Sequence, residues 1–443
     1  MPIAAVPEYL GQDFSDASPG LRFGMYLKLW GVNRRTQSLN WTTHDLDYEV
    51  RGQQQQEREV KKENKVAALS DAKRLTVRDQ KIMKALAARQ SALSGTVPAE
   101  QLLRLDAIGV APFTTGLGNE HPLENGFSFL NPYGLPYLPG SGVKGVLRQA
   151  ARELASGEWG ETKGWRNAPE YPIKIEKKEI LLSMLDVLFG RETPEGDSKH
   201  VRGALSFWDV IPQIEGDSLM VEIMTPHQAH YYQQKLDRKM GNSISPHDSG
   251  QPNPISFLTV PERTGFAFHV VCDLPFLRRL APELAEGGRW KALLTVAFEH
   301  AFAWLGFGAK TAVGYGAMRR DEEAEARAAK AKADREGELI RQQEAARRQA
   351  ERAAELATLS PIERKINEFL DARSDKNQKE VSAILGAVKG GQWQGDDKIA
   401  VAEWLKTRMQ DNKQWKESSQ AKRPEKDKEY QNTLLVKTWL EGK

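Results

Sequence analysis

Short apolar runs separated by glycine and proline loops dominate the chain from about residue 105 to residue 318. Four of them have the length and the β-type composition of strands: "GALSFWDVIP", "LMVEIM", "ISFLTV" and "GFAFHVVCDL". Two others, "KEILLSMLDVLFG" and "RWKALLTVAFEHAFAWLG", are predicted to be helices. The mixture favours an α+β fold with an antiparallel sheet over a doubly wound parallel sheet.

Two segments before residue 105 have different patterns. In "LRFGMYLKLW", residues 21–30, the apolar residues Phe23, Met25, Leu27 and Leu29 alternate, which predicts a half-buried strand. Residues 31–104 are rich in Gln, Lys, Glu and Ala and hold few large apolar residues. We expect them to be one or more exposed helices, a polar helical insertion within a core that spans residues 1–320.

The chain after residue 320 is predicted to be all helical. Residues 321–360 combine high helix propensity with opposite charges at helical spacing, which predicts a long, solvated helical spacer of roughly 60 Å at ~1.5 Å per residue. Ser360 and Pro361 then supply an N-cap and a first-turn proline. Residues 361–443 are expected to form a small helical domain, in which apolar stripes around Ile366, Ile384 and Leu405 meet.

Composition limits the classes of protein that fit. The formal net charge of +3 neither requires nor excludes a nucleic acid partner. The single cysteine, Cys272, rules out an internal disulfide or a thiolate metal cluster and fits a reducing compartment. No signal peptide is recognisable at the N-terminus, and no apolar run approaches the roughly 18 residues that cross a bilayer. We therefore expect a cytoplasmic protein with no membrane partner.

The stretch "GFGAKTAVGYGAM", Gly306 to Met318, places a lysine inside a glycine cluster. It is not a Walker A loop, because Ala309 precedes Lys310 and Trp304 stands where the first glycine belongs. The glycines instead form two G-x-G pairs separated by five residues. Gly308 and Gly314 would leave room for a partner's backbone, with Lys310, Thr311 and Tyr315 projecting from the loop. The alternative is an ordinary connection from a helix to a strand.

A second signal lies in "LPYLPGSGVKGVLRQAARELA", where a Pro-Gly-Ser-Gly turn opens into an amphipathic helix. Lys144, Arg148 and Arg152 follow one another at four-residue steps along one edge of that helix. A helix start with free amides and Ser141, beside basic side chains, can hold a phosphodiester backbone without reading its sequence. Such a stripe can also be a solvated face, and it is the combination with the glycine loop that favours phosphate contact.

These segments carry a resemblance to a known family. "PYLPGSGVKGVLR" resembles the P-G-S-S-x-K-G-x-x-R signature of RAMP proteins, which build CRISPR effector complexes, and "GFGAKTAVGYG" is similar to their glycine-rich loop. "TTGLGNEHPLENGFSF", "VLFG", "GALSFWDVIP" and "TPHQAHYY" followed by "PNPISFLTV" resemble, in order, the sixth-subunit family of the type III-B (Cmr) module. The resemblance covers residues 20–30 and 105–320. The insertion and the residues after 320 fall outside it.

The resemblance implies a ferredoxin-like (RRM-type) fold and a structural subunit, without cofactor or metal. That subunit would bind guide RNA near its 3′ end and cap the filament of repeated backbone subunits. Its implied partners are guide RNA and, through it, target RNA, together with the repeated backbone subunit and the terminal capping subunit. Ser141, Lys144 and Arg148 would meet guide phosphates from the helix, and Lys310, Thr311 and Tyr315 from the loop. Gly142 departs from the signature, since the family often has a second serine there.

Several residues are candidates for catalytic or metal-binding groups. His227 and His230 could act in RNA cleavage, but we expect His227 to anchor a loop or line the RNA path. We expect Asp209 to cap a turn. Glu120, His121 and Glu124 lack the spacing of a metal site. We expect no catalysis. Two alternatives stay open: a metal-independent endoribonuclease that processes guide RNA, and an adaptor that recruits a protein through the C-terminal helical domain.

Overall fold

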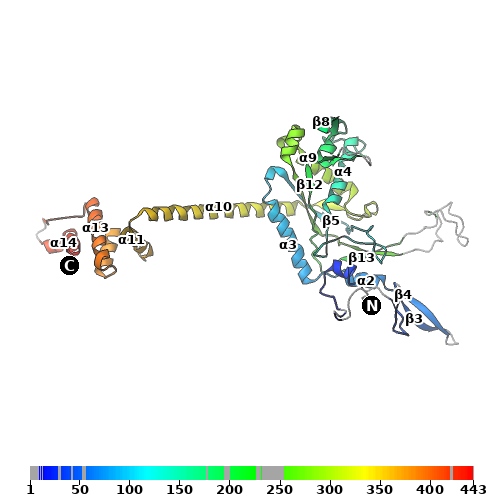
Figure 1. Cartoon of the computed structure of the whole chain (residues 1–443), viewed down its shortest axis with the longest axis horizontal. Coiled ribbons are helices and arrows are strands. Elements are labelled where there is room, and N and C mark those ends of the chain that lie inside the picture. Colours follow the sequence, from blue (N-terminus) through cyan, green and yellow to red (C-terminus); the bar gives the residue numbers. More distant parts are fainter. Residues whose placement is uncertain are drawn as a thin grey trace. The chain divides into compact units, whose positions relative to one another are not determined.

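The computed structural model describes most of the chain, namely residues 9, 11, 13–27, 31–40, 43–51, 56–175, 178–193, 200–225, 231, 254–419 and 423–442. The chain divides into two units, Met1–Lys332 and Ala333–Lys443. Figure 1 shows the elements of each unit coloured along the sequence. No helix among these residues is both long and apolar enough to span a bilayer.

An antiparallel sheet of four strands organises the first unit, in the spatial order β12-β15-β5-β16. The strands are β5 (Leu102–Gly109), β12 (Leu205–Phe207), β15 (Gly265–Cys272) and β16 (Met318–Arg320). Helix α4 (Gly140–Ser156) lies between β5 and β12 in the sequence, and α9 (Arg289–His300) between β15 and β16. The predicted α+β class with an antiparallel sheet is confirmed. These six elements follow one another in the order β-α-β-β-α-β, with other strands and helices between them, and the ferredoxin-like fold stays a prediction.

The hydrophobic core lies between this sheet and helices α4 and α9, which pack on each other. Alternate residues of β15, including Phe266 and Phe268, are buried, as period-two strand geometry requires. The Phe268 ring centroid lies 5.2 Å from that of Phe298 in α9 and 5.0 Å from that of Phe307. Helix α4 buries the apolar face predicted for it, with Leu147 fully enclosed.

The first unit contains further paired strands and helices. Paired strands are β6 (Phe129–Leu130) with β7 (Leu135–Pro136), β8 (Pro169–Ile175) with β9 (Lys178–Ser183), β10 (Gly190–Arg191) with β11 (Val201–Arg202), and β13 (Met220–Met224) with β14 (Ile255–Thr259). Helices are α1 (Pro19–Gly24), α2 (Lys65–Ala72), α3 (Val77–Ser94), α5 (Met184–Phe189), α7 (Leu274–Leu280) and α8 (Pro282–Ala285).

The strand predicted over residues 21–30 is wrong where the structure describes it. Pro19–Gly24 form helix α1, with Pro19 in its first turn, where a missing N–H costs nothing. Arg22 and Phe23 are both buried, so the alternation of apolar residues does not mark one face. The Arg22 guanidinium donates to the Asp71 carbonyl oxygen at 2.7 Å, a contact that the sequence pattern does not contain. Residues 28–30 lie outside the described residues.

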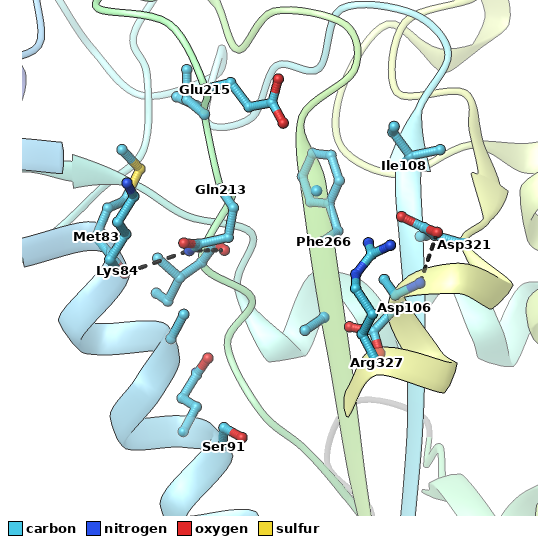
Figure 2. Close-up of a pocket in the computed structure, with 18 of the residues that line it drawn as sticks. Met83, Lys84, Ser91, Asp106, Ile108, Gln213, Glu215, Phe266, Asp321 and Arg327 are labelled. Atoms are coloured by element: carbon cyan, nitrogen blue, oxygen red, sulfur yellow. Dashed lines mark hydrogen bonds between the residues drawn. The ribbon is translucent and has the colours of Figure 1, made fainter. Parts of the chain in front are cut away.

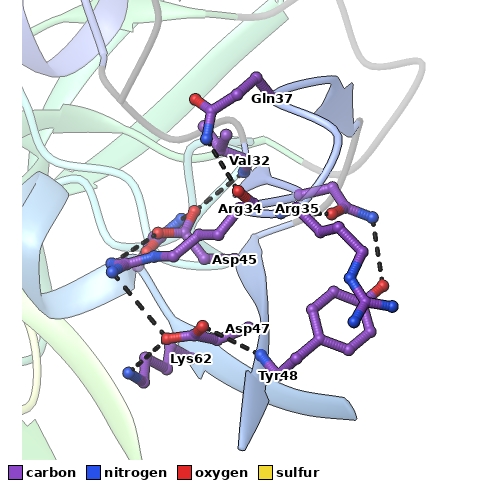
Figure 3. Close-up of polar contacts among 10 residues, drawn as sticks. Val32, Arg34, Arg35, Gln37, Asp45, Asp47, Tyr48 and Lys62 are labelled. Atoms are coloured by element: carbon purple, nitrogen blue, oxygen red, sulfur yellow. Dashed lines mark hydrogen bonds and ion pairs between the residues drawn. The ribbon is translucent and has the colours of Figure 1, made fainter. Parts of the chain in front are cut away.

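The insertion is only partly helical, which corrects the prediction for residues 31–63. Two short strands, β1 (Gly31–Val32) and β2 (Leu39–Asn40), precede a hairpin of β3 (His44–Arg51) and β4 (Gln56–Glu63). The Lys62 ammonium in β4 lies 2.7 Å from Asp47 in β3, and Arg34, in the turn between β1 and β2, lies 3.6 Å from Asp45, as Figure 3 shows. The pair of Lys62 with Asp47 joins the two strands, and a cross-strand pair of this kind stabilises a hairpin whose residues have high helix propensity. Helices α2 and α3 follow.

The helix predicted for "KEILLSMLDVLFG" is also wrong in its first half, which is strand β9. The helix α5 starts only after Ser183, whose hydroxyl accepts from the Asp186 N–H while the Asp186 carboxylate accepts from the Ser183 N–H. This reciprocal capping box fixes a helix start. A break inside the apolar run was therefore signalled by a serine followed three residues later by an acid.

Helix α10 (Glu322–Thr358) is the long helix expected after residue 320. The second unit then contains α11 (Pro361–Ala372), α12 (Glu380–Lys389), α13 (Gly395–Asp411) and α14 (Lys428–Leu440). Ser360 caps α11 with a capping box, as predicted. Ile366, Ile384 and Leu405 meet in a core separate from that of the first unit, and the predicted small all-helical region is confirmed.

Candidate nucleic-acid interface

The start of helix α4 approaches the edge of the sheet closely. A Cβ atom on Gly140 would lie 2.3 Å from the Phe207 carbonyl oxygen, so only glycine fits there. The Gly140 N–H donates to Asp209 Oδ1 at 2.7 Å, while the N–H groups of Gly142 and Val143 point to the Pro139 carbonyl. Asp209 therefore caps this helix from a distant segment, rather than its own turn as expected. Ser141 is exposed beside it.

The basic edge of α4 is partly neutralised within the protein. Arg148 lies 3.1 Å from Glu192 and 3.8 Å from Asp186, and its side chain is only 12% exposed. Arg152 also pairs with Glu192. Burial lowers the pKa of Arg148, and the charge of Glu192 opposes that shift. The acids that pair with these arginines, Asp186 and Glu192, are distant in the sequence and reach α4 only through the fold. Lys144 pairs with no acid among the described residues, which leaves it available to a phosphate.

The glycine loop between α9 and β16 is closed on its own backbone. Gly308 has φ +94°, and a Cβ there would lie 2.2 Å from the Thr114 carbonyl oxygen. Gly316 has φ +70°, and a Cβ there would lie 1.8 Å from the Phe307 carbonyl oxygen. The expectation that the paired glycines admit a partner's backbone is therefore corrected at both positions, because the chain itself fills the space. Gly314, at φ +96°, has no atom within 4 Å of its Cβ position.

Two candidate side chains of the loop turn toward the β13–β14 hairpin. The Lys310 ammonium lies 3.4 Å from Met224 Sδ and 5.4 Å from the Phe257 ring centroid. The Tyr315 hydroxyl donates to Glu222 Oε2 at 3.4 Å; burial first, and then the charge of Glu222, raise the pKa of Tyr315. Both contacts are long and partly exposed, so they orient the side chains without locking them. Thr311 is partly buried at the tip.

The predicted residues thus divide into two groups with different neighbours. Ser141, Lys144, Arg148 and Arg152 lie on α4, and the arginines contact the region of α5. Gly308, Lys310, Thr311, Gly314 and Tyr315 lie on the glycine loop and contact the β13–β14 hairpin. His227 and His230 lie outside the described residues.

An exposed pair of tryptophans was missed by the sequence analysis. Trp304 is 66% exposed and Trp159 is 49% exposed, and their ring centroids lie 5.3 Å apart. Trp304 belongs to a π-helical turn, Ala301–Leu305, that leads directly into the glycine loop. Exposed aromatic rings are a surface on which bases can stack. A tryptophan two residues before the first glycine was the signal, although its contact with Trp159 is not visible in the sequence.

His121 and Glu124, which the sequence does not predict to bind a metal, each contact other residues of the protein. His121 accepts from the Leu123 N–H at 3.1 Å through Nδ1 and contacts the Phe23 carbonyl oxygen at 2.9 Å through Nε2. Burial lowers the pKa of His121. Glu124 pairs with Lys65 at 2.7 Å. Among the residues that the structure describes, no group of three or more His, Cys, Asp or Glu side chains could hold a metal ion.

Comparison with known proteins gives a match to one family model and to one curated relative. Residues 108–319 match the model of the RAMP superfamily. The chain is 31% identical over 235 residues to the CRISPR system Cmr subunit Cmr6 of Pyrococcus furiosus, which covers 46% of this chain and 63% of that protein. The residues that match the family model, 108–319, contain the α4 start and the glycine loop. The chain thus spans less than two thirds of the length of this relative.

Solved structures give weaker likenesses. A cryo-EM structure of the type III-B Cmr-beta complex bound to cognate target RNA contains a chain with 17% identity and a TM-score of 0.35, covering 58% of this chain and 71% of that one. The crystal structure of Cmr6 from Pyrococcus furiosus has 26% identity and a TM-score of 0.26, covering 51% of this chain and 100% of that one. TM-scores this low carry no argument about the function of this chain.

We expect Gly316→Ala to destabilise the first unit more than Gly314→Ala does. Both substitutions put a Cβ on a residue with positive φ, but only Gly316 faces a backbone oxygen, at 1.8 Å. Overpacking of this kind adds about 2 kcal/mol to the loss of unfolding free energy. Thermal or urea unfolding of the two variants measures the difference. Equal losses would show that the loop does not close on Phe307.

Proposed function

We propose that this chain is a non-catalytic structural subunit of a type III-B CRISPR effector complex, because residues 108–319 match the model of the RAMP superfamily. In this role it binds the backbone of guide RNA and acts in antiviral defence in the cytoplasm. The match over residues 108–319 carries the proposal, because it contains both segments that the sequence analysis assigned to phosphate contact. The identity to Cmr6 supports the same complex type.

The geometry supports contact with a phosphate backbone at particular side chains. Lys144 lies at the first turn of α4, beside exposed Ser141, and pairs with no described acid. Lys310 and Tyr315 are held by long contacts that a phosphate can replace. Arg152 needs to exchange Glu192 for phosphate, and both side chains are exposed, at 46% and 61%, so that exchange costs little. Arg148, at 12% exposed, is held by Glu192 and Asp186. Trp159 and Trp304 add a surface for base stacking.

The finer role follows the family resemblance. The chain lies near the 3′ end of the guide RNA, caps the filament of repeated backbone subunits and contacts the terminal capping subunit. Target RNA is met through the guide. The sequence-independent contacts of lysine and arginine with phosphate suit a subunit that must accept every guide.

We expect the double variant Lys144→Glu, Lys310→Glu to bind all RNA sequences more weakly by the same factor. Each lost phosphate contact lowers the slope of log affinity against log salt by about 1. Fluorescence anisotropy with two unrelated single-stranded RNAs at several salt concentrations measures both quantities. Arg89→Glu, on the exposed face of α3, is the matched control. A loss confined to one RNA sequence would contradict phosphate contact.

We expect the purified chain to leave repeat RNA intact in EDTA. The proposal assigns no acid–base pair to this subunit, whereas the alternative function, metal-independent processing of guide RNA, needs one. Denaturing gels after incubation with labelled repeat RNA provide the measurement. Cleavage at one position, abolished by His227→Ala, would replace the structural role by the enzymatic one.

The second unit favours an additional adaptor role. Its helices α11–α14 enclose a core of their own and lie outside the residues that match the family. A domain that is not needed to build the RAMP fold is free to recruit another protein.

We expect a chain that ends at Lys332 to bind guide RNA as tightly as the full chain does. The candidate RNA contacts all lie in the first unit, so removing Ala333–Lys443 removes none of them. Anisotropy with the full chain and the shortened chain compares the two affinities. A loss of tenfold or more would assign RNA binding to the second unit and would contradict the adaptor role.

A further inference from the structure

A cavity of about 540 Å³ lies on the face of the sheet opposite the core. Its floor is formed by β5 and β15, and its walls by helix α3 and the first turns of helix α10. Figure 2 shows α3 on one side of the two strands and the start of α10 on the other. The volume is within the range of small-molecule sites in proteins, roughly 300–1,000 Å³.

The walls are held by specific contacts with the sheet. The Asp106 N–H donates to Glu325 Oε1 at 3.1 Å, and the Asp321 N–H donates to the Asp106 carbonyl oxygen at 2.8 Å, which fixes α10 to β5. On the other side, α3 is tied to the segment that follows β12: Gln213 Nε2 lies 3.5 Å from the Met83 carbonyl oxygen, and Gln90 donates to the Asp209 carbonyl at 2.6 Å. Both α3 and α10 lie outside residues 108–319, so the family fold alone does not form this cavity.

The floor contains a buried histidine without a partner. His269 lines the cavity and is 3% exposed, yet within the described part of the chain neither of its ring nitrogens makes a hydrogen bond of ordinary geometry. Its ring stacks on Trp208, with centroids 5.2 Å apart and planes at 25°. A buried polar group left unpaired destabilises a protein, and such groups in native structures call for an explanation.

Electrostatics keep this histidine neutral. Burial, and next the charge of Arg104, lower the pKa of His269 to about 4, and the backbone of Ala267 opposes the shift in part. Arg104 is itself paired with Asp106 at 2.9 Å. At neutral pH the imidazole therefore offers one donor and one acceptor and no charge. A neutral ring beside buried Asp106 does not suit a bare anion.

The rim of the cavity, in contrast to its neutral floor, is positively charged. Three exposed cationic residues line it, Lys84 from α3, Arg263 before β15 and Arg327 from α10. Two acids line it as well, Glu215 and Asp321, and Asp321 accepts from the Ala324 N–H at 3.0 Å. Arg327 also lies 3.6 Å from Glu323, but both side chains are exposed, so this pair is weak. The excess charge at the rim is positive.

We propose that this cavity binds one nucleotide, with its base against His269 and its phosphate at the rim cations. A neutral donor and acceptor at depth match the hydrogen-bonding edge of a base, and stacking on Trp208 holds the plane of the imidazole in place. The cationic rim matches the phosphate. The nucleotide comes either from an RNA strand, which rests on the proposed function, or from solution, which does not.

Equilibrium titration of the full chain tests the assignment. The probes are the four 5′-mononucleotides, a short single-stranded RNA and inorganic phosphate. We expect saturable binding of at least one mononucleotide or of the RNA, and a tenfold loss in His269→Leu. Lys84→Ala should lose about threefold, whereas Lys81→Ala, a matched change on the outer face of α3, should lose nothing.

The melting temperature of the ligand-free protein gives a second readout. His269→Leu removes an unpaired polar group, so it should melt at the same or a higher temperature than the natural protein. If His269→Leu does not fold, Ala87→Trp fills the cavity from α3, and Ala88→Trp on the exposed face of that helix is its control. Ala87→Trp should abolish binding and Ala88→Trp should leave it unchanged.

The outcomes distinguish a nucleotide within an RNA strand from a free nucleotide, and they distinguish the cavity proposal from the proposed function. Loss of mononucleotide binding in His269→Leu supports a free nucleotide, and loss of RNA binding alone supports a nucleotide within a strand. Binding that is unchanged in His269→Leu and Ala87→Trp, or phosphate that binds as tightly as the nucleotides, overturns the inference. RNA binding that depends on Lys144 and Lys310 but not on His269 overturns it while leaving the proposed function intact.

Discussion

The hydrogen bonds of strand β5 hold the first unit together. β15 pairs along one edge of β5 and β16 along the other, so the two halves of the sheet meet at this strand. Its inner face, with Leu105 and Ala107, closes the core, and its outer face, with Arg104 and Asp106, forms the floor of the cavity. The polypeptide just beyond β5 supplies the Thr114 carbonyl against which the glycine loop folds. A substitution that distorts β5 would therefore disturb both the cavity and the glycine loop.

The glycine loop shows how the fold makes an RNA-binding surface from tight packing. Gly308 and Gly316 are required because the loop lies against its own backbone, with the Ala309 N–H donating to Thr114 and the Phe307 N–H to Gly316. That closure turns Lys310 and Tyr315 toward the β13–β14 hairpin. The glycines act on a partner indirectly, since they fix where the lysine and the tyrosine lie.

Apolar periodicity and capping residues predicted the elements that are stabilised mainly by residues close to one another in the sequence. Strands β13, β14 and β15, helices α4 and α9 and the capped start of α11 all follow from periodicity and capping residues. The predictions were wrong where residues distant in the sequence determine the local structure. Arg22 is buried because its guanidinium donates to carbonyl oxygens of α2 and of the turn after it. The β3–β4 hairpin is stabilised by pairs such as Asp47 with Lys62. The same limit applies at the site, where Glu192 and Asp209 reach α4 through the fold. His269 gave no signal, because its lack of a partner is visible only in three dimensions.

Photo-cross-linking of the full chain to guide RNA, read out by mass spectrometry, tests most directly whether helix α4 and the glycine loop hold the same strand. The account predicts cross-linked peptides from both Gly140–Ser156 and the loop between Gly306 and Gly316, on neighbouring nucleotides of one RNA. Cross-links that fall outside both segments, for example only within Ala333–Lys443, would contradict it.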